Sequence, residues 1–270
     1  MCPDFYYPDT KSIGKLTGDL PEKAERYFSA QFLKNQDGII FIEGNLSAYG
    51  LQKMLCKVLG GFRTSKNFSV RSKMAYQLRS GWSTYTTGRD ETGLGEGSGA
   101  NIAMAAERPF TMQSWCAFRI AVEHLRRELV VDLAPLGQYF EVVPDLRLLP
   151  TERIAIYINC RPCPSEGLPA DVEPADPMEV MNRLRDALVR ISSATLTPST
   201  LTGLKEALST EMAGEVANPD YLMEAVLRRN SEGKDMISNC STYLSKVTAQ
   251  DVYDVIAALE KGSKVEYVIK

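Results

Sequence analysis

The chain has 270 residues, of which 44% are hydrophobic and 24% charged, so it can bury a full hydrophobic core and is not mainly disordered. Its formal net charge of −3, with basic residues mixed among acids, excludes the basic surface that nucleic-acid binding needs. No apolar run reaches the roughly 18 residues that a membrane helix requires. We therefore expect no nucleic-acid partner and no membrane span.

The compartment is only weakly indicated. The N-terminus lacks the basic head and apolar segment of a signal peptide, although such a segment could have been removed from a longer parent chain. Six cysteines lie mostly within apolar segments, where reduced cysteines behave as small hydrophobic side chains. This usage slightly favours the reducing cytoplasm, while a periplasmic location stays open.

Cys160 and Cys163 have the C-x-x-C spacing of a redox pair or of half a zinc site. No second C-x-x-C and no pair of histidines exists to complete a metal site. The two cysteines also end a predicted strand, whereas a reactive pair is expected at a helix N-terminus, where the thiol pKa is lowered. We interpret the spacing as structural and keep a thiol enzyme as a minor alternative.

The first third of the chain alternates helices and short strands. Residues 1–20 contain scattered prolines and glycines and are predicted to be an irregular lead-in to a single domain over residues 21–270. A helix is expected from Pro21 to Leu33, a buried strand from Ile39 to Glu43, and an amphipathic helix from Tyr49 to Leu59 with Ser47 as its N-cap.

Two weakly alternating segments, Phe68–Met74 and Gly81–Thr86, indicate a hairpin. The glycine-rich segment Gly93–Gly99 follows, but it lacks the last glycine of G-x-G-x-x-G and the lysine of a Walker loop, and Glu96 would repel phosphate. We interpret it as a surface loop rather than a nucleotide site. It leads into a predicted strand over residues 100–105.

The central unit of the predicted fold is a long helix followed by two strands. Apolar residues recur at helical spacing from Gln113 to Leu133, so one face of this helix must be buried. A turn leads into the strand Gln138–Val143, and a second turn into the strand Arg153–Cys160. A helix packed on an antiparallel strand pair is the expected core.

The last third is mainly helical. Thr248 and Asp251 form a capping box that begins the last helix. The other predicted elements are helices over Pro177–Ser192, Pro198–Met212, Tyr221–Asn230 and Met236–Lys246, and a final strand, Val265–Ile269. The element order predicts an α+β fold, a mainly antiparallel sheet covered on one face by helices.

Several of these segments, in this order, resemble the insulinase/pitrilysin-type zinc peptidases, which include the mitochondrial processing peptidases. The similar segments are Ile39–Gly61, Leu133–Val142, Asn218–Tyr221, Gly233–Asp235, Lys246–Val252 and Val265–Ile269. Active members of that family hold zinc through H-x-x-E-H, in which a glutamate is the general base. This chain has one histidine, His124, four residues before Glu128 on the long helix, so it resembles a non-catalytic domain that binds no cofactor itself.

The resemblance also implies a substrate contact. Non-catalytic domains of the family supply an arginine and a tyrosine, seven residues apart. In this sequence the tyrosine is Tyr139, preceded by Gly137, but the arginine position holds Asp132. An aspartate cannot donate to a peptide carbonyl. Either Arg126 or Arg127 reaches the site from the preceding turns, or the contact has been lost, and we favour the loss of the contact. Glu123, Glu128 and Asp132 are expected to form a solvated helix face.

The resemblance implies a domain that closes a proteolytic chamber and binds extended peptide, with zinc held by a partner domain that carries H-x-x-E-H. Peptide is expected to add as a strand to a sheet edge, and we predict that the segment Asn101–Ala105 is such an edge. The expected substrate-binding residues are Tyr139, Gly137, Asn101, Ala103 and Arg127. The alternative is an assembly scaffold of the same fold that binds no substrate.

Overall fold

The fold is described from a computed structural model, for residues 18–29, 40–42, 44–60, 81–88, 99–148, 151–163 and 175–270. The chain divides into two compact units, Asp4–Met74 and a larger one that contains Ala75–Lys270. Each unit is described by itself. The boundary at residue 20 and the single domain over 21–270 stay predictions.

The smaller unit contains helices α2 (Leu20–Phe28) and α3 (Ala48–Leu59). The Ser47 hydroxyl accepts a hydrogen bond from the Gly50 N–H, so the predicted N-cap is confirmed. The predicted strand Ile39–Glu43 is wrong for residues 40–42, which are irregular, and Ile40 is 56% exposed. The predicted end of the first helix, residues 30–33, lies outside the described residues.

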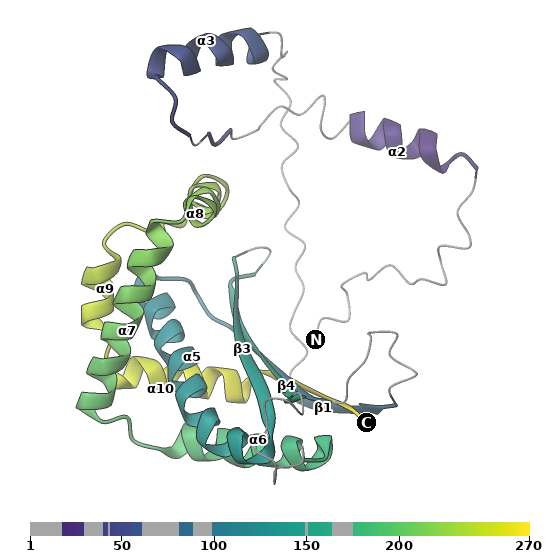
Figure 1. Cartoon of the computed structure of the whole chain (residues 1–270), viewed down its shortest axis with the longest axis vertical. Helices are drawn as coiled ribbons and strands as arrows, with labels where there is room; N and C mark the ends of the chain where they lie inside the picture. Colours follow the sequence, from purple (N-terminus) through teal and green to yellow (C-terminus); the bar gives the residue numbers. More distant parts are fainter. Residues whose placement is uncertain are drawn as a thin grey trace. The chain divides into compact units, whose positions relative to one another are not determined.

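The larger unit is built on a five-stranded sheet (Figure 1). Its order is β1-β5-β2-β4-β3; β1 pairs with β5 in parallel, and the other three pairings are antiparallel. The predicted α+β fold with a mainly antiparallel sheet is therefore confirmed. The strands are β1 (Gly81–Thr87), β2 (Gly99–Glu107), β3 (Gln138–Arg147), β4 (Arg153–Pro162) and β5 (Ser263–Ile269).

The predicted sheet edge at Asn101–Ala105 is wrong. These residues lie in β2, the central strand, which pairs with β4 on one side and β5 on the other. Their backbone groups already belong to two ladders, so no peptide strand can add there. The strand β2 is central because the final strand, β5, lies between it and β1. Within the described strands, β1 and β3 are the outer ones.

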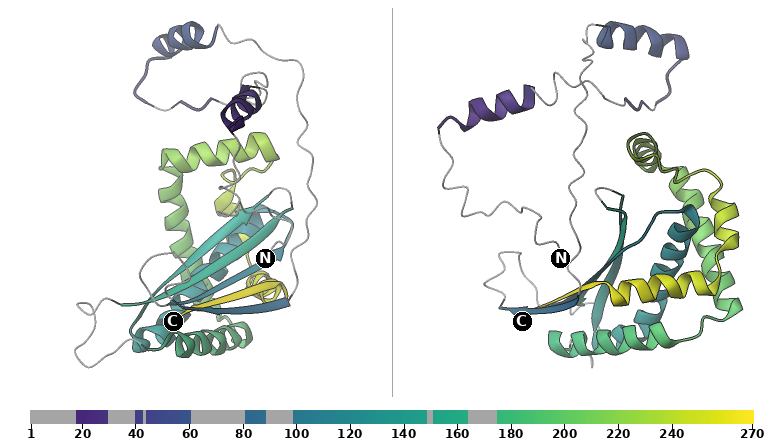
Figure 2. Two further views of the ribbon diagram at one scale, coloured as in Figure 1. Left: turned by 90° about the vertical axis from the view of Figure 1, so that its right-hand side faces the viewer. Right: turned by 180° about the vertical axis from the view of Figure 1, so that it is seen from behind.

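Helices α5, α6 and α10 cover one face of the sheet, and α7, α8 and α9 lie beyond them (Figures 1 and 2). Alternate residues of β2 and β4, such as Ile102 and Ile156, point into this layer and belong to the same buried core cluster as Phe118 and Leu125 of α5. The helices are α5 (Met112–Leu133), α6 (Pro177–Ser193), α7 (Pro198–Val216), α8 (Pro219–Glu232), α9 (Cys240–Lys246) and α10 (Ala249–Lys261).

The helix ends follow local side-chain chemistry. Thr248 and Asp251 form the predicted capping box of α10, and Thr111 with Ser114 forms another that begins α5. The predicted helix over Met236–Lys246 begins only at Cys240. The Asp235 carboxylate accepts hydrogen bonds from the N–H groups of Ile237 and Ser238, which holds these residues in a turn. These bonds also lower the pKa of Asp235 to about 2.

Candidate functional site

The turn between α5 and β3 places Tyr139. After α5, the short 3₁₀ helix η2 (Ala134–Leu136) ends at Gly137, whose φ of 64° is in the left-handed region that favours glycine. The Gly137 carbonyl accepts a hydrogen bond from the Cys163 N–H at 2.9 Å, which joins this turn to the end of β4. Tyr139 follows at the start of β3 with 62% of its surface exposed.

Tyr139 lies on the sheet face opposite helices α5, α6 and α10 of the larger unit. Its neighbours in the strand, Phe140 and Val142, pack toward the core, and side chains alternate between the faces. The residue opposite Tyr139 on β4 is Arg161, which follows the buried Cys160 and is exposed. Tyr139 and Arg161 are therefore cross-strand neighbours on the same face.

Asn101 and Ala103 lie on this same face. Each alternates with a buried residue of β2, and their β4 partners are Asn159 and Tyr157. Both are half-buried, and the Asn101 amide donates to the Tyr267 carbonyl at 3.5 Å. We call this helix-free surface, Tyr139, Arg161, Asn159, Asn101, Ala103, Tyr157 and Glu141, the open sheet face. The structure thus places three of the five predicted site residues, Tyr139, Asn101 and Ala103, on one face of the sheet, although β4 lies between Tyr139 and the two β2 residues.

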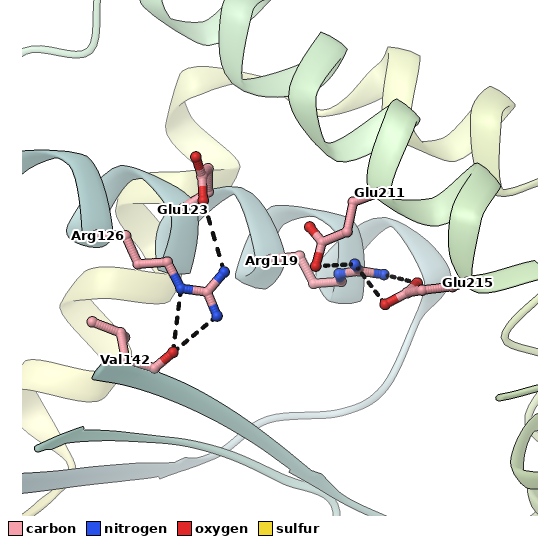
Figure 3. Close-up of polar contacts among 6 residues, drawn as sticks. All are labelled: Arg119, Glu123, Arg126, Val142, Glu211 and Glu215. Atoms are coloured by element: carbon pink, nitrogen blue, oxygen red, sulfur yellow. Dashed lines mark hydrogen bonds and ion pairs between the residues drawn. The ribbon is translucent and has the colours of Figure 1, made fainter. Parts of the chain in front are cut away.

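The arginines of α5 do not reach Tyr139. The Arg126 guanidinium donates two hydrogen bonds to the Val142 carbonyl, at 2.9 and 3.3 Å, and pairs with Glu123 (Figure 3). Arg127 also pairs with Glu123, at 2.9 Å. The hypothesis that either arginine replaces the family's missing one is therefore wrong in this structure, and Arg127 lies apart from the open sheet face.

A third arginine of α5, Arg119, joins this helix to α7. It is buried and forms a bidentate pair with Glu215, at 2.6 and 2.9 Å, and a further pair with Glu211 at 3.1 Å (Figure 3). Burial lowers the pKa of Arg119, but the bonds to Glu215 and Glu211 raise it more, so the pKa lies above its ordinary value. The side chain is structural and carries a permanent charge.

Asp132, which the resemblance predicts to occupy the position of a substrate arginine, is also structural. It is 8% exposed and forms ion pairs with two arginines of α6, Arg190 at 2.5 Å and Arg183 at 3.3 Å. Arg190 also binds Glu128, at 2.8 Å. The prediction of a solvated acidic face is therefore wrong for Asp132: this carboxylate joins α5 to α6.

Replacing Asp132 with asparagine is expected to lower the free energy of unfolding by about 1–2 kcal/mol, because both arginines are half exposed and water partly screens the lost pairs. Urea unfolding followed by circular dichroism measures the change. Asp186→Asn, at an exposed α6 site with no ion pair in the described part of the chain, is the control and should be neutral. Equal stability of both variants would show that the arginines do not depend on Asp132.

The described residues offer little for metal or thiol chemistry. His124 is buried in α5, and burial lowers its pKa. No group of three metal-ligating side chains occurs within the described ranges, nor does a helix there have the length and apolarity to cross a membrane. Burial raises the pKa of Cys160 to about 12, so this thiol is held protonated and is a poor nucleophile. Metal-free function of the chain stays a prediction.

No family model matches the sequence, and no curated protein matches it. A mutant of the ferredoxin protease FusC, in complex with Arabidopsis ferredoxin, has a TM-score of 0.64, with 15% identity over 99% of this chain. A protease from Helicobacter pylori has a TM-score of 0.62, with 10% identity over 84% of this chain. A predicted insulinase family protease from Yersinia pestis has a TM-score of 0.54, with 11% identity over 84% of this chain.

The chain has the insulinase-type protease fold. At this level of identity the likeness concerns the fold alone. The chain spans 28%, 54% and 50% of the three proteins' own lengths, so it corresponds to a part of those longer chains.

Arg161 is the site residue that the sequence analysis missed. The sequence contains a signal for Arg161, because apolar and polar residues alternate along β4. This alternation places Arg161 on the other face of the sheet from the buried Cys160. Its pairing with Tyr139 requires the register of the β3–β4 hairpin, in which Arg147 lies opposite Arg153. The predicted strand limits did not fix that register.

Proposed function

We propose that this chain is a non-catalytic domain of an insulinase-type zinc protease, which closes the proteolytic chamber over a catalytic domain carrying H-x-x-E-H and binds extended peptide. The observation that carries this proposal is the open sheet face, where Tyr139 at the start of β3 is exposed beside Arg161 at the end of β4. Zinc would be held by the partner domain, since this chain has one histidine.

The polar side chains of the open sheet face support the binding of peptide through side-chain hydrogen bonds. An extended peptide presents N–H and C=O groups that need partners, and Asn101, Asn159, Tyr139 and Arg161 offer donors and acceptors in adjacent strands. Aromatic rings supply contact area at a low cost in side-chain entropy. Strand addition at Asn101–Ala105 is excluded by the central position of β2, so side chains of this face, rather than its backbone, would make the contacts.

The second candidate function is an assembly scaffold of the same fold without substrate binding. Asp132 favours it, because the position of the family's substrate arginine is used to join α5 and α6. Tyr139 distinguishes the two candidates, since its hydroxyl would contact peptide in a substrate-binding domain and would have no ligand in a scaffold.

The test is to assay peptide hydrolysis by this chain with and without an H-x-x-E-H domain. We expect none from the chain alone and turnover from the pair. In the pair, Tyr139→Phe should lower kcat/KM about threefold to tenfold, the effect of one hydrogen bond at a binding site. Tyr27→Phe, at an exposed site on α2, is the matched control.

Unchanged kcat/KM in Tyr139→Phe would favour the scaffold, and turnover that never depends on this chain would contradict the proposal. The metal content gives a separate check by atomic emission. One tightly bound zinc per isolated chain would contradict the non-catalytic assignment.

A further inference from the structure

The surroundings of Arg161 indicate which peptide group it would bind. Arg161 and Tyr139 are opposite residues of β4 and β3, and both are exposed on the open sheet face. At this spacing the guanidinium and the phenol lie within reach of one ligand group. Both side chains are hydrogen-bond donors, and a guanidinium cannot accept, so the ligand must supply acceptor oxygens.

Gly99 lets β2 approach the β4 backbone closely beside Arg161. It lies at the start of β2, beside Cys160 and Arg161 of β4. A Cβ at residue 99 would lie 2.6 Å from the Cys160 carbonyl oxygen and 4.0 Å from the Arg161 Cγ. Another side chain would therefore clash with the β4 backbone directly before Arg161, while its Cβ would make only an ordinary van der Waals contact with the Arg161 stem.

Among the described residues Arg161 has no ion-pair partner, unlike most described arginines of the larger unit. Arg119, Arg185 and Arg190 each bind a carboxylate at 2.5–2.6 Å. No carboxylate of the described residues lies within ion-pair distance of Arg161. The nearest acid by register is Glu141, two residues after Tyr139 on the same face, opposite Asn159.

We infer that Arg161 and Tyr139 bind a carboxylate of the peptide, which is either its C-terminus or an acidic side chain; the inference rests on the proposed function. A planar carboxylate offers two oxygens to the guanidinium fork and leaves a lone pair for the Tyr139 hydroxyl. Glu141 opposes the bound charge and lowers the affinity. The face thereby distinguishes acidic from neutral peptides.

The experiment measures the binding of three fluorescent peptides to the full chain by anisotropy. One has a free C-terminal carboxylate and no acidic side chain, one is amidated with a single central glutamate, and one is amidated with glutamine in its place. We expect Arg161→Gln to raise Kd about tenfold for an acidic peptide and to leave the neutral peptide within twofold. Whichever acidic peptide responds identifies the source of the carboxylate.

Two further variants sharpen the test. Glu141→Gln should lower Kd for the acidic peptide severalfold, an opposite change that misfolding cannot imitate. Lys261→Gln removes one positive charge at the end of α10 and should leave all three affinities unchanged. Circular dichroism establishes that each variant is folded.

The outcomes separate this inference from the proposed function. If all three peptides bind equally and Arg161→Gln changes nothing, the carboxylate site is refuted while peptide binding stands. If Lys261→Gln weakens binding as much as Arg161→Gln, the effect is one of net charge and the site is again refuted. If no peptide binds, both the carboxylate site and peptide binding by the isolated domain are refuted.

Discussion

Replacing Gly262 with alanine is expected to destabilise the larger unit by about 3 kcal/mol or more, because the new methyl group meets backbone atoms that cannot move aside. Gly262 joins α10 to β5, and a Cβ there would lie 2.1 Å from the Ala105 carbonyl oxygen and 3.1 Å from the Ala258 carbonyl oxygen. Ala105 belongs to the central strand β2, which is held on both sides. Urea unfolding monitored by circular dichroism measures the loss.

The matched control is Gly203→Ala in the interior of α7. A Cβ at this position meets no atom within 4 Å. Alanine should raise the free energy of unfolding by about 0.5–1 kcal/mol, the difference in helix propensity. The close approach of α10 to β2 would be refuted if Gly262→Ala unfolded at the same urea concentration as the natural protein.

Replacing Glu266 with glutamine is expected to cost about 2–3 kcal/mol at neutral pH, since one partner of a buried ion pair is removed. The Glu266 side chain is 1% exposed, and it accepts two hydrogen bonds from Arg185 of α6, at 2.5 and 2.8 Å. It also accepts one from the Thr84 hydroxyl of β1, at 2.8 Å. The carboxylate thus joins β5, β1 and α6, and glutamine leaves the Arg185 charge unpaired.

The cost should depend on pH in a defined direction. Burial raises the pKa of Glu266, but the bonds from Arg185, Thr84 and Trp82 lower it more, so the folded pKa lies below its ordinary value of 4.5. The stabilisation by the charged form is therefore fully present above pH 4.5 and is lost as the pH falls through the folded pKa.

The difference in unfolding free energy between the natural protein and Glu266→Gln should accordingly shrink below pH 4.5. Urea titrations at neutral and acid pH measure it. Glu206→Gln, at an exposed position of α7, is the control and should differ little from the natural protein at any pH. A difference for Glu266→Gln that stayed constant down to acid pH would show that the charge of this carboxylate contributes nothing.

The parts of the fold that the sequence predicted well depend on local signals. The long helix α5 and the strands β3 and β4 follow from hydrophobic periodicity, and the start of α10 follows from the capping pair Thr248 and Asp251. The start of α9 was placed too early because the apolar spacing from Met236 is helical. There the Asp235 side chain competes with the helix for backbone N–H groups.

What the sequence did not reveal depends on contacts between distant segments. Strand order is one case, since nothing local in Val265–Ile269 indicates that this strand enters the sheet beside Asn101. Asp132 is another, because its arginine partners lie on a different helix. For the candidate site, Tyr139 came from a family resemblance, whereas Arg161 requires the hairpin register.

The position of β5 has a consequence for how the sheet forms. Thr84 of β1 and Glu266 of β5 are in contact although 182 residues separate them in the chain. Closing so long a loop costs entropy before the paired strands return any energy, so such pairings form slowly. The β3–β4 hairpin and α5 can associate during synthesis, whereas β1 must wait until residues 263–269 have left the ribosome. Until then β1 and one side of β2 lack their β5 partner, and unpaired strand edges of this kind favour aggregation.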